Sequence, residues 1–435
     1  MCGICGEIRF DGSAPSLAAN QTMAEALKHR GPDAGGFFAQ DFTALAHRRL
    51  SILDISAASQ QPMIDSELGL ALVFNGCIYN FRELRTELQR KGYRFFSDGD
   101  TEVIIKAYHA WGPRCVERFL GMFAFAIYER DTRRVVMARD RLGIKPLYLA
   151  DIGQGLGKGL RFASTLPALL AAGGVDTSID PVALHHYMSF HAAVPAPMTI
   201  VKGVRKLPPA TILTIEPDGR RREQTYWDIS VHTRPEDRAM TEREWREAVL
   251  ESFRTAVERR RVSDVPIGVL LSGGLDSSLN VALLAESGHT DLKTFSVGFE
   301  SVGNVEGNEF RYSDLVAQRF GTDHHRIHID AIRFLDAMPG VVESMSEPMM
   351  SHDAIGFYLL SQEVSKHVKV VQSGQGADEV FGGYHWYPKM LRANDPVSEY
   401  ANVYFDRDHA EMADVLSPRF MGEDHSRAFV EDFFE

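Results

Sequence analysis

The chain has 435 residues, enough for two or three domains, and its 44% apolar and 24% charged residues exclude disordered, collagen-like and coiled-coil proteins. Its 47 Lys and Arg against 59 Asp and Glu give a net charge of −12, which argues against nucleic acid or a membrane surface as a partner. No run approaches the ~18 apolar residues of a membrane span. The N-terminus lacks a secretory-signal pattern, and four cysteines cannot form a disulfide framework, so we expect a cytoplasmic protein.

Mixed helix and strand patterns predict an α+β domain in the first half. An apolar run over 71–74 ends at Asn75-Gly76, a turn or loop signal. A helix is predicted over 81–89, and a second one is capped by Asp100 or Thr101. Further predicted elements are strands over 122–128, 135–138, 146–150 and 160–163 and a short helix opened by Asp180-Pro181.

A change of pattern near residues 217–240 predicts a domain boundary. This segment begins with a turn signal and continues with charged, polar sequence, so we expect a linker between domains at 2–216 and 241–435. Thr241-x-x-Glu244 is a capping box that begins a helix. The apolar residues expected to be buried by that helix are Trp245, Val249, Phe253 and Val257.

Strands and helices alternate in the second half, which predicts a doubly wound α/β domain with a parallel sheet covered on both faces. Ligands of such sheets bind at the carboxyl ends of the strands. Two glycine-rich loops, over 272–274 and 373–376, each follow a predicted strand at that end. The predicted strands are 266–271, 294–299, 325–329 and 368–372, and the helices begin at Ser277 and span 312–320.

The loop over 272–278 has the composition of a phosphate-binding turn. Its glycines let the backbone approach a phosphate, and the following helix N-terminus attracts anions. A tight turn alone would not need this many Ser, Gly and Asp residues. Asp276 is a candidate Mg²⁺ ligand, joined by Asp378 of the second loop; ordinary surface acids are the alternative for that second loop.

Cys2 is a candidate nucleophile. Removal of Met1 would leave a cysteine whose own α-amine can accept the thiol proton. A buried thiol without a role is the ordinary alternative. Cys2-x-x-Cys5 also allows a redox or zinc motif, but no second Cys or His pair completes a zinc site.

Seven motifs in the first half resemble class II glutamine amidotransferases, which carry an N-terminal Cys nucleophile in an Ntn-hydrolase αββα sandwich. The loop over 270–278 resembles that of the ATP-pyrophosphatases, and together the halves resemble the glutamine-hydrolysing asparagine synthetase family over residues 2–390. The motifs are MCGICGEIRFDG, His29–Asp33, Arg48–Asp54, Asn75-Gly76, Gly99–Glu102, Gly121–Phe125 and Gly143–Tyr148.

The resemblance implies a role for each matched residue. Cys2 would form a glutamyl thioester, with Asn75 and the Gly76 N–H as the oxyanion hole. Released ammonia would pass through an internal tunnel and attack an acyl-adenylate made from ATP. The implied glutamine-binding residues are Arg49, Leu50, Ser51, Asn75, Gly76, Cys77 and Asp100. The implied ATP-binding residues are Leu270, Ser272, Gly273, Gly274, Asp276, Ser277, Ser278, Val297, Ser373 and Gly374, with Mg²⁺ held by Asp276 and Asp378.

Three departures from the family pattern bear on the acceptor carboxylate. Cys77 replaces an acid, Gln375 replaces a Glu near the adenylate, and an aromatic run spans 384–388. These features are similar to the branch called N-acetylglutaminylglutamine amidotransferase, so we expect that dipeptide as acceptor, with aspartate as the alternative. Beyond residue 390 the family's EARVPFLD-like segment is not found, so we expect an incomplete second domain. Two alternative functions are a glutaminase with an inactive synthetase domain and a non-enzymatic binding protein. A homodimer is a possible assembly.

Overall fold

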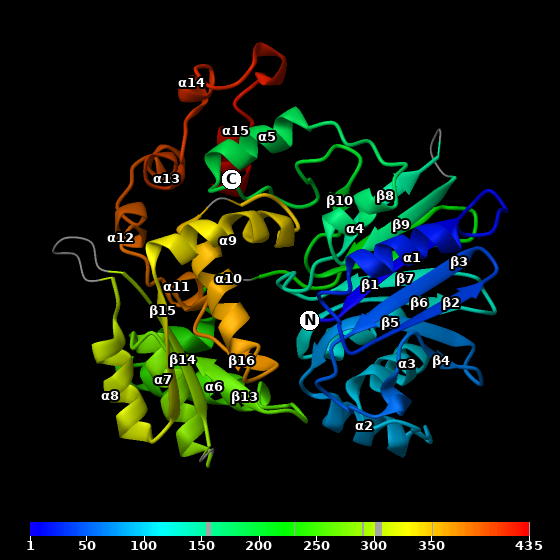
Figure 1. Ribbon diagram of the computed structural model, residues 1–435, viewed down its shortest axis with the longest axis horizontal. Coiled ribbons are helices and arrows are strands. Elements are labelled where there is room, and N and C mark those ends of the chain that lie inside the picture. The colour runs from blue at the N-terminus through cyan, green and yellow to red at the C-terminus, as the bar shows by residue number, and fades with distance from the viewer. Residues whose placement is uncertain (154–157, 230, 289–290, 301–306, 350, 435) are drawn as a thin grey trace. The chain divides into compact units, whose positions relative to one another are not determined.

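The computed structural model describes residues 1–153, 158–229, 231–288, 291–300, 307–349 and 351–434 (Figure 1). They form two compact units: Met1–Ser230 with Arg407–Ser426, and Val231–Asp406 with Arg427–Glu435. Glu435, with which the expected second domain ends, lies outside the described residues. Among the described helices, none combines the length and the apolar composition that a membrane crossing requires.

Two six-stranded sheets form the centre of the first unit, and each strand pairs with antiparallel neighbours. The first sheet has the order β10 (Arg205–Lys206), β8 (Tyr148–Ile152), β9 (Gly159–Ala163), β1 (Gly3–Arg9), β3 (Thr43–Arg49) and β2 (Ala34–Gln40). The second has the order β12 (Arg221–Thr225), β11 (Thr211–Ile215), β7 (Val135–Arg139), β6 (Gly121–Glu129), β5 (Leu70–Ile78) and β4 (Met63–Asp65).

Helices cover the outer faces of this pair of sheets (Figure 1). On the first sheet lie α1 (Leu17–Ala26) and α4 (Leu166–Ala171), and on the second lie α2 (Phe81–Arg90) and α3 (Asp100–Trp111). Alternation along β1 fixes this layering, because Ile4 and Ile8 join the core between the sheets whereas Cys5 joins the core beneath α1. The expected αββα sandwich is confirmed.

The Asn75-Gly76 turn prediction is wrong, because both residues lie inside β5. An Asn-Gly pair often marks a turn, but here Gly76 permits close strand packing. A Cβ on Gly76 would lie 2.2 Å from the Met122 carbonyl oxygen. The predicted cap of α3 also differs: Gly99 is the N-cap, and Asp100 is the first helical residue.

Part of the predicted linker belongs to the first unit. Residues 221–225 form β12, which pairs with β11 across a turn at Gly219. The strand sequence Arg-Arg-Glu-Gln-Thr is polar because β12 is the last strand of its sheet. A polar edge strand has no apolar periodicity, and it therefore resembles a linker in sequence.

Four parallel strands form the sheet of the second unit, as expected. Their order is β15 (Asp323–Ile329), β14 (Lys293–Phe299), β13 (Ile267–Leu270) and β16 (Val370–Gln372). Because the chain adds β14 and β15 on one side of β13 and β16 on the other, the sheet has a switch point beside β13. One face is covered by α7 (Leu275–Glu286) and α8 (Phe310–Phe320), and the other by α9 (Ala331–Ser344) and α10 (His352–Val364).

The helix α6 (Glu242–Arg259) begins with the predicted capping box. Its predicted buried face is only partly formed, since Val257 is buried but Trp245 and Val249 are 42% and 41% exposed. The periodicity correctly indicates the helix, but periodicity alone does not say whether another element covers its apolar side.

Short helices complete the chain. In the first unit α5 (Pro181–Ser189) contacts residues 407–426. We call these residues the returning segment, because there the chain comes back from the second unit to the first, between Asp406 and Arg427. The remaining helices are α11 (Ala377–Phe381), α12 (Tyr387–Met390), α13 (Pro396–Tyr404), α14 (His409–Met412) and α15 (His425–Phe434). Short 3-10 helices are Ala57–Ser59, Gly112–Arg118, Pro235–Ala239 and Pro418–Phe420.

Candidate functional site

The candidate nucleophile Cys2 lies immediately before β1. The Leu50 amide donates to Sγ at 3.4 Å, and Arg30 Nε donates to the Cys2 carbonyl oxygen at 3.1 Å. Burial raises the pKa of the Cys2 thiol, although the Leu50 amide, the N-terminal amine and Arg49 act in the opposite direction. The thiol is therefore protonated at neutral pH, and it needs a base before it can attack.

The second cysteine of the Cys2-x-x-Cys5 pair faces away from this site. Cys5 is fully buried beneath α1, and burial raises its pKa to about 12. In the part of the chain that the structure describes, no cysteine forms a disulfide. A thiol sealed in an apolar layer is a poor redox partner or metal ligand, so this arrangement disfavours the redox and zinc alternative.

Asn75 offers a hydrogen-bond donor that the described part of the protein does not use. The side chain is 1% exposed, and within the described residues its Nδ2 has no hydrogen-bond partner. A buried donor without a partner costs stability, about 1–3 kcal/mol. Such a donor suits an oxyanion hole, where it would bind charge that develops during a reaction.

Arg49 at the end of β3 is held by the loop that follows. Its NH1 donates to the Ser56 carbonyl oxygen at 2.9 Å, and its NH2 donates to the Asp54 carbonyl oxygen. NH2 also donates to the Leu53 carbonyl oxygen at 3.5 Å, so among the described residues the N–H of Nε and one N–H of NH1 are left to bind a carboxylate. The guanidinium plane is thus fixed before a ligand arrives.

The loop itself depends on Asp54, for which sequence analysis proposed no role although it ends a recognised motif. Its carboxylate accepts hydrogen bonds from the hydroxyls of Ser56 and Ser59 and from the Asp98 amide, at 2.5–2.8 Å. Burial opposes ionisation, but these hydrogen bonds are stronger in effect and lower the pKa of Asp54 to about 2. Asp54 therefore links the Arg49 loop to the residues that precede α3.

Asp100 begins α3 and is 4% exposed. Its Oδ2 accepts a hydrogen bond from the Ile78 amide at 2.9 Å. Burial raises the pKa of Asp100 to about 6. A buried carboxylate with few compensating charges is well suited to bind an ammonium group.

Three further residues of the first unit are predicted to bind glutamine. Leu50 contacts the Cys2 thiol through its backbone. The Ser51 amide donates to Asp33 Oδ2 at 2.8 Å. Cys77 lies in β5 and is 9% exposed.

A second candidate site is a cavity of about 330 Å³ at the switch point of the parallel sheet. Most of the residues predicted to bind ATP line this cavity. The predicted residues that line it are Leu270, Ser272, Gly274, Asp276, Ser277, Val297, Ser373, Gly374, Gln375 and Asp378. Gly273 and Ser278 are not among its lining residues.

Gly273 instead has a structural reason to be glycine. Its φ is +89°, and a Cβ there would lie 2.5 Å from the Ser313 amide nitrogen in α8. The turn is closed by Ser272 and Ser277, whose hydroxyl oxygens are 3.0 Å apart. The loop is therefore a tight strand-to-helix turn with its amides next to the N-terminus of α7.

The two predicted loops lie side by side. A Cβ on Gly374 would lie 3.0 Å from the Asp276 Cβ and 3.3 Å from the Ser277 amide nitrogen. Asp276 and Asp378 both line the cavity, and in the described residues neither carboxylate has a hydrogen bond or ion pair. Two free carboxylates at one cavity fit a hard divalent cation such as Mg²⁺.

The sequence singles out the aromatic run for the acceptor, and that run reaches the cavity through Tyr384, but no sequence signal predicts the wall that α10 supplies. Asp353 and Phe357 of α10 line it, as does Tyr384, whose hydroxyl donates to Glu379 Oε1 at 2.8 Å. This hydrogen bond raises the pKa of Tyr384 to about 12. No sequence motif marks Asp353 or Phe357, because only the tertiary fold brings α10 to this edge.

Residues 1–227 match the family described as glutamine amidotransferase domain, and residues 248–432 match the family described as asparagine synthase. The chain belongs to the glutamine-hydrolysing asparagine synthetase family. It is 36% identical over 394 residues to asparagine synthetase [glutamine-hydrolyzing] 1 of Bacillus subtilis, covering 90% of this chain and 60% of the relative. It is 35% identical to the putative asparagine synthetase [glutamine-hydrolyzing] 2 of Methanocaldococcus jannaschii, covering 88% and 76%.

The chain thus spans 60% of the length of the B. subtilis relative and 62% of that of the Mycobacterium tuberculosis relative, which is 37% identical. Among solved structures, the glutamine phosphoribosylpyrophosphate amidotransferase from B. subtilis matches with a TM-score of 0.40 and 13% identity. That match covers 88% of this chain and 92% of the other.

Proposed function

We propose that this chain hydrolyses glutamine at Cys2 and uses the ammonia to amidate an acceptor carboxylate that ATP has activated. The observation that carries the proposal is the buried Nδ2 of Asn75, which has no hydrogen-bond partner among the described residues and lies in a unit that also holds Cys2 and Arg49. Membership of the family supports both halves of the reaction.

In the first half, removal of Met1 frees the α-amine of Cys2. Burial lowers the pKa of the present N-terminal amine to about 6, so an amine in this environment is mostly neutral at pH 7. It accepts the thiol proton as Sγ bonds to the glutamine amide carbon. Asn75 Nδ2 and the Gly76 N–H stabilise the oxyanion, ammonia leaves with the transferred proton, and water then hydrolyses the thioester to glutamate.

Arg49 and Asp100 bind the two charged ends of the glutamine backbone. The planar guanidinium binds the α-carboxylate, and the buried Asp100 carboxylate binds the α-ammonium. Both charges act on the Cys2 thiol, which supports their placement near one substrate. Because Cys77 stands where the family has an acid, Asp100 supplies the negative charge for the ammonium.

In the second half, the switch-point cavity binds ATP. Leu270 and Val297 contact the adenine, and the 272–278 turn binds the phosphates. Asp276 and Asp378 hold Mg²⁺, which neutralises phosphate charge when bound. The acceptor carboxylate displaces pyrophosphate to form an acyl-adenylate, and ammonia then displaces AMP to form the amide.

For the acceptor we propose N-acetylglutaminylglutamine. Gln375 lines the cavity without adding a charge, and Phe299, Phe357 and Tyr384 give it an apolar wall suited to a larger acceptor than aspartate. The second candidate is aspartate, which the names of the relatives favour. A glutaminase whose synthetase half is inactive is the third.

The test measures glutamate and pyrophosphate release in one reaction with glutamine, ATP and Mg²⁺, adding the dipeptide or aspartate. We expect pyrophosphate release with the dipeptide only. Release with aspartate at an equal or greater rate would refute the acceptor proposal. Glutamate release without pyrophosphate in either case would establish the third candidate.

Replacing Cys2 by Ala separates the two halves. We expect Cys2→Ala to lose glutamine-dependent activity and to keep pyrophosphate release driven by ammonium salts. Cys115→Ala is the matched control, because Cys115 is a buried thiol outside the site. Glutaminase activity that survives in Cys2→Ala would refute the nucleophile assignment.

A further inference from the structure

Four of the sixteen histidines of the chain gather where the returning segment meets α5. None of them belongs to the two sites above. His185 and His186 lie on α5, His409 begins α14, and His425 begins α15. Asp424 precedes His425 in the same turn.

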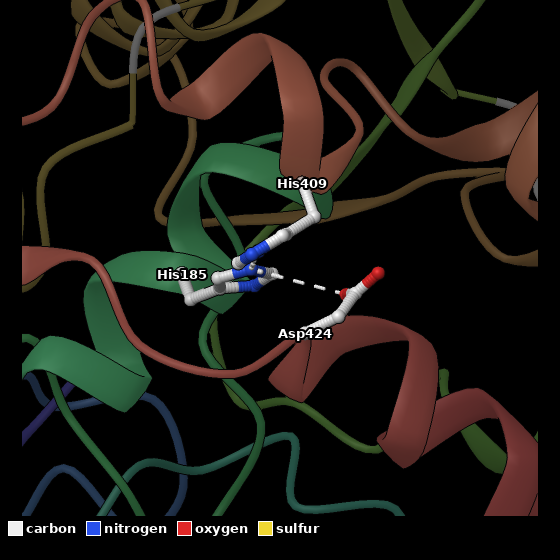
Figure 2. Close-up of side chains that lie close together, drawn as sticks. All are labelled: His185, His409 and Asp424. Atoms are coloured by element: carbon white, nitrogen blue, oxygen red, sulfur yellow. Dashed lines mark hydrogen bonds and ion pairs between the residues drawn. The ribbon is translucent and has the colours of Figure 1, made fainter.

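Three side chains of this group bring one possible metal-ligand atom each close together (Figure 2). His185 Nε2 lies 2.9 Å from His409 Nδ1 and 3.8 Å from Asp424 Oδ1. All three atoms lie within 4.8 Å of one another. The ligand atoms of a tetrahedral zinc ion lie about 3.3–3.5 Å from one another. Shifts of about 1 Å or less would therefore bring these three atoms to the spacing of zinc ligands.

The surroundings of His185 orient it as a ligand. Its side chain is 2% exposed, and its Nδ1 lies 2.7 Å from the Ser426 hydroxyl oxygen. With the proton on Nδ1 donated to Ser426, the Nε2 lone pair points to His409 and Asp424. Burial lowers the pKa of His185, so the ring is neutral at neutral pH, which is the form that binds metals.

We propose that His185 Nε2, His409 Nδ1 and Asp424 Oδ1 bind one divalent transition-metal ion of the zinc type, which fastens the returning segment to α5. Two imidazoles and one carboxylate suit zinc better than Mg²⁺ or Ca²⁺, which prefer oxygen ligands throughout. His409 and Asp424 are partly exposed, so an ion can enter and water can fill the fourth position.

The fastening role follows from the origin of the ligands. His185 comes from the N-terminal half of the chain, whereas His409 and Asp424 lie more than 220 residues later. The neighbouring contacts are ordinary hydrogen bonds, such as Ser189 Oγ to the Arg407 carbonyl oxygen at 3.3 Å. An ion that binds only the assembled site stabilises the folded arrangement by mass action.

The experiment uses the untagged full chain, stripped with a chelator and dialysed against Zn²⁺. We measure bound zinc by elemental analysis and the melting temperature with and without Zn²⁺. The variants are His409→Ala and Asp424→Asn, which change partly exposed residues and leave the buried His185 in place. The matched control is His109→Gln, an exposed histidine on α3 of the same unit.

We expect wild type and His109→Gln to retain one more zinc ion per chain than His409→Ala and Asp424→Asn. The affinity for Zn²⁺ should be at least about 10-fold weaker in each of these two site variants. Zn²⁺ should raise the melting temperature of wild type and the control only. Substituted Co²⁺ should give a visible absorption band that both variants lose. Equal zinc content in all four proteins, or no zinc retained by wild type, would refute the site. Zinc retained without any rise in melting temperature would refute the fastening role.

Discussion

Replacing Asn75 by Ala should separate a catalytic role from a structural one. Removing one oxyanion donor lowers kcat by about 10²–10³-fold, which corresponds to about 2.7–4 kcal/mol of transition-state stabilisation. We expect that loss in glutamate release, with little change in KM for glutamine, because the Asn75 amide would act on charge that develops only during the reaction.

Stability should respond differently from activity. Within the described residues Asn75 Nδ2 has no partner, so Asn75→Ala removes a buried unsatisfied donor that costs about 1–3 kcal/mol. The small cavity left behind costs a similar amount and offsets this gain. We therefore expect the melting temperature to change by less than about 4 °C, which is the effect of about 1 kcal/mol on a unit of this size.

Asn80→Ala provides the matched control, since Asn80 is a paired amide just beyond the same strand. Its Nδ2 donates to the Arg118 carbonyl oxygen at 3.0 Å, and its Oδ1 accepts from the Leu120 amide at 2.9 Å. Losing both hydrogen bonds should lower the melting temperature by about 2–8 °C and leave glutaminase activity unchanged. Glutamate release within 10-fold of wild type in Asn75→Ala would refute the oxyanion assignment.

Three further predictions concern carboxylates. Because the pKa of Asp100 is raised to about 6, KM for glutamine should rise as pH falls through 6. Initial rates measured over a pH series should show this rise for the wild type and not for Asp100→Asn. A wild-type KM that stays constant between pH 5 and 7 would contradict the prediction. The same shift means that ionised Asp100 favours the unfolded chain, so its contribution to stability declines as pH rises from about 4 to 6. The pKa of Asp54 is lowered to about 2, so ionised Asp54 stabilises the folded chain fully above about pH 4, and this stabilisation is lost as pH falls through 2. Asp54→Asn should lower the melting temperature at pH 7 and raise KM for glutamine, because the loop would no longer hold Arg49. An unchanged melting temperature would count against the role of Asp54 in the loop. Asp276→Asn and Asp378→Asn should each reduce acceptor-dependent pyrophosphate release at least about 100-fold and leave glutamate release intact, whereas equal losses in both assays would indicate misfolding.

Local sequence signals predicted most of the elements. Helix α2 and the capping box of α6 follow from patterns within a few residues, and the structure has both. The parallel sheet was also predictable, because strands that are buried on both faces are continuously apolar. The glycine loops could then be assigned to its carboxyl edge, and the cavity lies there.

Features that depend on residues far away in the sequence could not be predicted from local patterns. Asn75-Gly76 has the composition of a turn, but its use inside β5 depends on the approach of β6. Trp245 and Val249 lie on an apolar stripe without a cover in the described residues. The His185, His409 and Asp424 group has no sequence spacing to find, since its members meet only when the returning segment folds onto α5.

The returning segment also sets an order of events during synthesis. Residues 1–230 leave the ribosome first, but the segment that contacts His185 and Ser189 follows roughly 175 residues later. At about 5–20 residues per second, this delay lasts about 10–35 s. Throughout that interval the nascent N-terminal unit exposes the polar, histidine-bearing side of α5, so its completion waits for translation of the second unit.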